Sequence, residues 1–129
     1  MELMTPVSPG ELLDKLTILD IKAERIEDAE KLANVAHERQ LLEDVWQRSG
    51  LENAETVRLR SELKRVNEQL WEIEDAIRDE ERARRFGERF IELARAVYVT
   101  NDERAAIKKA INLELGSQIV EEKSYSEYL

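Results

Sequence analysis

LRSELKRVNEQLWEIEDAI, residues 59–77, has the most regular apolar spacing in the chain. Its apolar residues recur at alternating intervals of four and three, so they share one face of an α-helix, and charged residues flank that face. The unbroken pattern predicts a helix of about 30 residues, about 45 Å long at the standard rise per residue. Its apolar seam is formed by Leu59, Leu63, Val66, Leu70, Ile73 and Ile77. A seam this regular predicts self-association, most simply a two-fold homodimer in which long helices or hairpins pack together.

Two helices are expected before this seam. Ser8 can cap the first, with Pro9 at the first helical position, and Glu11 has the spacing that a capping box requires. The apolar face that follows is wide, which predicts contact with more than one neighbour. Its members are Leu12, Leu13, Leu16, Ile18, Leu19, Ile21, Ala23 and Ile26. Asp28 is the next plausible cap, and the second helix is expected to end near Gly50, so the two helices predict a short-turn antiparallel hairpin.

Two more helices are expected after the seam. Glycine is common just past a helix end, so Phe86-Gly87 predicts the end of the long helix. The fourth helix would then carry Phe90, Leu93, Ala94, Val97 and Tyr98. Thr100 and Glu103 repeat the capping-box spacing, which predicts a fifth helix that ends at Gly116.

The composition agrees with a helical protein of one domain. Charged residues make up 38 % of the 129 residues and aromatic residues 5 %, with four glycines and two prolines. Such a composition is typical of long solvated helices. We therefore expect one all-α domain over residues 1–129, a bundle of five helices with one long coiled-coil-like helix and antiparallel hairpin connections. An N-terminal arm is expected at about 1–7 and a C-terminal tail at 117–129.

Charge and cysteine content exclude several classes of function. The formal net charge of −9 argues against nucleic-acid binding, because phosphate backbones require clustered Lys and Arg. The chain contains no cysteine, so it has neither disulfides nor thiolate chemistry. No segment has the apolar length of a signal peptide or of a membrane span. We expect a soluble, cytoplasmic protein that binds no membrane.

Several groups of residues could form a ligand site. Trp71 has Glu74 and Asp75 as helical neighbours, so its ring could bind a cation or an aromatic group, or simply pack at the edge of the bundle. An arginine patch near the expected turn could bind an anion, or complement the end of the long helix. Its members are Arg78, Arg82, Arg84, Arg85 and Arg89. The stretch RAVYVTNDER, residues 95–104, could form a recognition corner or an ordinary turn.

Carboxylate pairs at same-face spacing allow one enzymatic interpretation. Glu24 with Glu27, and Glu72 with Asp75, have the spacing by which all-helical nucleotide hydrolases hold magnesium. A chain with 29 acidic residues contains such spacings by chance, however, and a solvated helix face explains most of them. No metal site and no catalytic residue is therefore assigned.

Four blocks of the sequence resemble an uncharacterised family. SPGELLDKLTILDIKAERI, LWEIEDAIRDEE, FGERFIELARAVYVTNDERAAIKKAIN and VEEKSYSEY occur in that order and are similar to small helical bacterial and phage proteins, classed as a domain of unknown function. Relatives near glycosyltransferase and surface-polysaccharide genes imply an accessory role in cell-envelope sugar metabolism. The resemblance supplies no catalytic assignment.

Two functions remain open from the sequence. The first is a non-enzymatic interaction or scaffold module without a cofactor, with a protein partner or a second copy of itself. The alternative is a metal-dependent phosphate- or nucleotide-processing enzyme, which would use magnesium. The enzyme would use Trp71, the carboxylates of Glu74 and Asp75, and the arginine patch. The candidate ligand-binding residues are Trp71, Glu74, Asp75, Arg78, Arg89, Tyr98, Asn101, Asp102 and Arg104.

Overall fold

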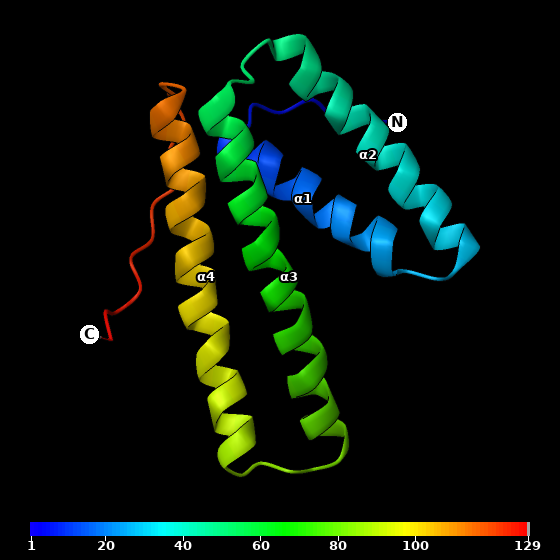
Figure 1. The fold of residues 1–129 in the computed structure, drawn as a ribbon, viewed down its shortest axis with the longest axis vertical. Coiled ribbons are helices and arrows are strands. Elements are labelled where there is room, and N and C mark those ends of the chain that lie inside the picture. Colours follow the sequence, from blue (N-terminus) through cyan, green and yellow to red (C-terminus); the bar gives the residue numbers. More distant parts are fainter. Residues whose placement is uncertain (129) are drawn as a thin grey trace.

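The computed structural model describes residues 1–128, and within them it contains four helices and no strand. These are α1 (Pro9–Arg25), α2 (Ala29–Ser49), α3 (Ala54–Arg82) and α4 (Glu88–Glu114). α1 and α2 form one antiparallel hairpin, and α3 and α4 form a longer one (Figure 1). α1 packs against α2, α3 and α4 and so joins the two hairpins, while the lower part of the α3–α4 hairpin extends beyond it (Figure 1).

Side-chain caps begin three of the helices. The Ser8 hydroxyl accepts a hydrogen bond from the backbone N–H of Glu11, and the Asp28 carboxylate accepts one from the backbone N–H of Lys31. Both caps confirm the helix starts predicted from the sequence. A reciprocal capping box between Asn53 and Thr56 begins α3.

The prediction of five helices is wrong, because the fourth and fifth form one continuous helix, α4. Thr100, the expected cap, is buried inside this helix. Asn101 and Asp102 have the residue types of a turn, yet their polar atoms contact Arg104 and Lys123. Neither Gly nor Pro interrupts residues 88–114, so nothing in the backbone opposes continuation of the helix.

The turn between α3 and α4 also differs from the prediction. α3 ends at Arg82, and Arg84, a non-glycine residue, adopts the positive φ of 54° that closes the turn. Gly87 does not terminate α3 but precedes the first residue of α4.

The predicted oligomer seam lies largely within the core of the single chain. Leu59, Leu63, Val66 and Leu70 are buried, and Ile73 and Ile77 are half-buried. The core cluster joins all four helices and consists of Leu12, Leu13, Leu16, Trp46, Leu59, Leu63 and Ile111. The regular spacing of α3 is therefore explained by packing against the chain's own helices, and a dimer would have to use another surface.

Both ends of the chain are irregular. Residues 1–7 are exposed and lie outside the helices. Of the predicted tail, residues 117–128 follow α4 without helical structure and lie beside it (Figure 1). Residue 129 lies outside the described residues.

Candidate functional site

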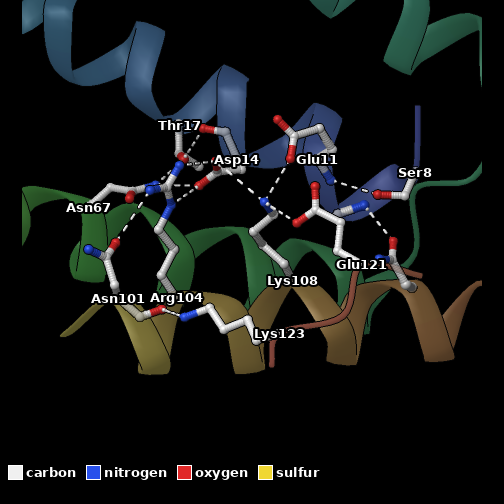
Figure 2. Close-up of polar contacts among 12 residues, drawn as sticks. Ser8, Glu11, Asp14, Thr17, Asn67, Asn101, Arg104, Lys108, Glu121 and Lys123 are labelled. Carbon is white, nitrogen blue, oxygen red and sulfur yellow. Dashed lines mark hydrogen bonds and ion pairs between the residues drawn. The ribbon is translucent and has the colours of Figure 1, made fainter. Parts of the chain in front are cut away.

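A buried carboxylate lies where α1 meets the α3–α4 hairpin (Figure 2). Asp14 of α1 is 1 % exposed, and its two oxygens accept hydrogen bonds from the guanidinium of Arg104, with Nε 2.8 Å from Oδ1. The Asn67 amide of α3 donates to Asp14 Oδ1 and to Thr17 Oγ1, each at 3.0 Å. We call these four residues the Asp14 network. It connects three helices, and the hydrogen bonds to Asp14 raise the pKa of Arg104.

The local sequence of α1 explains this placement. Gly10, Asp14, Thr17 and Ile21 recur at intervals of four, three and four, so they form a second buried stripe beside the leucine face. A carboxylate buried in such a stripe must be paired to be tolerated. The two-pronged guanidinium of Arg104 supplies that partner.

A second set of charged side chains holds the C-terminal tail against α4 (Figure 2). Lys108 Nζ lies 2.7 Å from Glu11 Oε2 and 3.0 Å from Glu121 Oε2. Burial alone would lower the pKa of Lys108, but these hydrogen bonds outweigh burial and raise it. Further along the tail, Lys123 lies 3.0 Å from the carboxylate of Asp102.

Beside the Asp14 network lies a hollow of about 440 Å³ between α1, α3 and α4, here called the central hollow. Its apolar side is formed by Ile18, Ile21, Leu70 and the half-buried ring of Trp71. Its polar side is formed by Asn67, Glu74, Asp75, Arg78, Asn101 and Arg104. The volume lies within the range of about 300–1,000 Å³ that small-molecule sites occupy.

The charges of the central hollow are nearly balanced. Arg78 Nε lies 3.3 Å from Glu74 Oε2, and the guanidinium of Arg104 is already paired with Asp14. Arg104 also makes a long contact of 3.5 Å to the Asn101 side-chain oxygen. The hollow therefore offers donors and acceptors together rather than a single strong charge.

The structure gathers six of the nine candidate residues in the central hollow: Trp71, Glu74, Asp75, Arg78, Asn101 and Arg104. The other three lie elsewhere. Asp102 lines a hollow of about 460 Å³ with the tail, and Tyr98 lies beside it, its ring 5.1 Å from that of Tyr128. Arg89 lines a separate groove between α3 and α4. The nine residues therefore form three groups rather than one site.

Sequence reasoning missed the residues that hold this site together. Asp14, Thr17, Asn67 and Lys108 are not among the candidate residues of the sequence analysis. The available signal was the polar pair Asp14 and Thr17 at three-residue spacing, next to the leucine face of their helix. Glu11 was assigned to a cap, whereas its carboxylate contacts Lys108.

Two further chemical properties follow from the described residues. Within residues 1–128, no group of three or more His, Cys, Asp or Glu side chains lies close enough together to hold a metal ion. Across the same residues, none of the helices combines the length and the apolar character needed to span a membrane.

The chain is a small all-α protein of two helical hairpins, with a hollow between α1, α3 and α4 that is lined by one tryptophan ring and by polar side chains. The chain belongs to a family of unknown function, DUF6165, whose model matches residues 3–129. Neither a curated protein nor a solved structure matches the chain.

Proposed function

We propose that the chain is a non-enzymatic binding module that holds a sugar unit in the central hollow. The observation that carries this proposal is the half-buried Trp71 ring beside side chains that both donate and accept hydrogen bonds. A pyranose ring has an apolar face of C–H groups and a rim of hydroxyls, each of which can donate and accept. Its apolar face suits the indole ring, and its rim suits Asp75, Asn101 and the outer edge of Arg104.

The charge balance favours a neutral ligand over a phosphate. Both cations of the hollow already have carboxylate partners, Arg78 with Glu74 and Arg104 with Asp14. A phosphate would have to compete with those partners and would lie near the carboxylate of Asp75. A neutral hydroxylated ligand requires no such exchange.

This role agrees with the family resemblance of the sequence. A module that binds a sugar without transforming it would assist a partner enzyme of surface-polysaccharide metabolism, and we place that role in the cytoplasm. A chain without cysteine does not need an oxidising compartment to fold.

The alternative function, a metal-dependent phosphate- or nucleotide-processing enzyme, has less support. Glu24 is paired with Lys64, and Glu72 is paired with Arg25. Of the two carboxylate pairs with the spacing of magnesium ligands, only Asp75 lines the central hollow, beside Glu74. Thermal stabilisation by magnesium or manganese, together with turnover of a nucleotide panel that Glu74→Ala abolishes, would favour the enzyme instead.

Calorimetric titration with neutral hexoses, N-acetylhexosamines and their short oligomers tests the sugar site. We expect at least one of them to bind, and Trp71→Ala to weaken its binding at least tenfold, which corresponds to about 1.4 kcal/mol. Asp75→Asn should weaken it as well, because an acceptor for two hydroxyls is altered.

The matched control is Asp79→Asn, one turn further along α3. Asp79 is exposed, is paired with Arg82 and does not line the hollow, so affinity should not change. If no sugar of the panel binds, or if Asp79→Asn weakens binding as much as Asp75→Asn does, the proposal is wrong.

A further inference from the structure

A second hollow borders the central hollow on the side of the C-terminal tail. Its volume is about 300 Å³, at the lower end of the range of small-molecule sites, and it is here called the adjoining hollow. Asn101 and Arg104 line both hollows, so these two residues form the boundary between them. The tail contributes Glu121, Lys123 and Tyr125 to the wall of the adjoining hollow.

Two ion pairs hold the tail at the edge of the adjoining hollow. The Glu121 carboxylate lies 3.0 Å from Lys108 Nζ, and Lys123 Nζ lies 3.0 Å from the Asp102 carboxylate. Lys123 Nζ also donates to the backbone oxygen of Asn101 at 3.4 Å, so the tail is attached directly to one of the two shared residues (Figure 2). The wall is therefore built by contacts within the chain and needs no ligand to form.

The Tyr125 ring is the aromatic surface of the adjoining hollow. Tyr125 is 84 % exposed and lies two residues beyond the point where Lys123 is held. The Lys123 ammonium lies 6.0 Å from the ring centroid, at the outer limit of a cation–π contact, so the ring remains open to another partner. A tyrosine suits a hydroxylated ligand, because its ring is apolar and its hydroxyl can both donate and accept.

The two shared residues have hydrogen-bonding groups that a ligand can use. Arg104 directs Nε and Nη2 to Asp14, whereas Nη1 makes the long contact of 3.5 Å with the Asn101 side-chain oxygen. A contact of that length is weak, so both groups can turn to a ligand at little cost. They lie at the boundary, where a ligand in either hollow would meet them.

We propose that the two hollows bind two linked units of an oligosaccharide, one beside Trp71 and the next beside Tyr125. The inference rests on the sugar site proposed above and extends its ligand to at least two units. The linkage passes over Asn101 and Arg104, which offer donors and an acceptor to both units. The cations of the adjoining hollow, like those of the central hollow, already have carboxylate partners, so the second unit is neutral as well.

Calorimetric titration of the full chain with matched monosaccharides and disaccharides tests the second subsite. The monosaccharides are glucose, galactose and N-acetylglucosamine, and the disaccharides are maltose, cellobiose, lactose and N,N′-diacetylchitobiose. We expect a disaccharide to bind about tenfold more tightly than either of its units, a difference of about 1.4 kcal/mol. The gain arises because the second contact is intramolecular once the first has formed.

Substitutions separate the two subsites. Tyr125→Ala should remove the advantage of the disaccharide and leave the binding of the monosaccharide unchanged, whereas Trp71→Ala should weaken both. Tyr125→Phe keeps the ring and should retain most of the advantage. Ser124→Ala is the matched control, because Ser124 is an exposed neighbour in the tail that lines neither hollow.

The outcomes distinguish the second subsite from the function on which it rests. If a monosaccharide binds in a way that depends on Trp71 and no disaccharide binds more tightly, the second subsite is wrong and the sugar site stands. An advantage of the disaccharide that Tyr125→Ala leaves intact overturns the second subsite as well. If no sugar of either size binds, both proposals are wrong.

Discussion

Gly10 lies where the start of α1 approaches α4 most closely. Its backbone N–H donates to the Asn112 side-chain oxygen at 2.8 Å, between residues 102 positions apart in the chain. A Cβ atom at this position would lie 2.5 Å from the backbone oxygen of Lys108 and 2.9 Å from the Asn112 oxygen. The absence of a side chain therefore allows α1 to dock, and it brings Asp14 within reach of Arg104.

Gly10→Ala should lower the free energy of unfolding by about 1–3 kcal/mol, the usual cost of overpacking. Backbone atoms of Lys108 cannot move aside as a flexible side chain would, so α1 itself must shift. Urea denaturation followed by circular dichroism measures the change.

Gly87→Ala is the matched control for this prediction. Nothing lies within 4 Å of a Cβ at Gly87, and the φ of this residue is negative. The substitution should therefore change the free energy of unfolding by less than about 1 kcal/mol. Equal destabilisation by both substitutions would show that the contact with α4 is not the cause.

At the scale of elements, a cap-like pattern in the sequence does not by itself determine where a helix begins. Ser8 and Asp28 cap the helices that the sequence predicts. Thr100 has the same cap-like pattern but lies inside α4, because its side is buried against the rest of the fold. Whether a Thr or Asn caps a helix or packs within it depends on the neighbouring element, which local spacing does not reveal.

The tail is held by ion pairs whose carboxylates are exposed, so its docking should depend on pH. Hydrogen bonds from Lys108 and Lys123 lower the pKa values of Glu121 and Asp102, respectively. Because docking lowers the pKa of each carboxyl, the ionised carboxylates stabilise docking at pH values above their ordinary pKa of about 4. That stabilisation is lost as the pH falls through the lowered pKa values, so residues 118–128 should be ordered at pH 7 and released at a pH well below 4.

Glu121→Gln should weaken docking at pH 7, because it removes the charge that faces Lys108. Exposed pairs contribute about 0–1 kcal/mol each, so the release should be partial. Glu122→Gln is the control, since its oxygen lies 3.9 Å from an exposed Lys109. Heteronuclear NOE values of the tail amides measure both effects, and a tail that stays equally ordered at a pH well below 4 would contradict this account.

At the scale of the whole molecule, apolar periodicity predicted the helical class, the α1–α2 hairpin and the contact of α1 with several neighbours. Apolar periodicity could not distinguish an apolar stripe that packs within the chain from one that packs between chains. Leucine and valine residues such as Leu63 and Val66 are equally suited to both kinds of contact. The central hollow was predictable in part, because Trp71, Glu74, Asp75 and Arg78 share one helix. Ile18 of α1 and Arg104 of α4 join it only through the way in which these two helices pack on α3, which spacing within a helix does not determine.

Because α1 packs against every other helix, the two hairpins should unfold together. Trp46 lies in the core that α2 shares with α1, and Trp71 lines the central hollow, so each reports on a different hairpin. In the single-tryptophan variants Trp71→Phe and Trp46→Phe, normalised fluorescence and circular dichroism transitions in urea should coincide within each variant. Adding Leu16→Ala, which removes a fully buried side chain of α1, should lower the unfolding free energy by about 2–5 kcal/mol in either background. If α1 merely capped the α3–α4 hairpin, Leu16→Ala would shift the Trp46 signal and leave the Trp71 signal in place, and the two hairpins would be separate folding units.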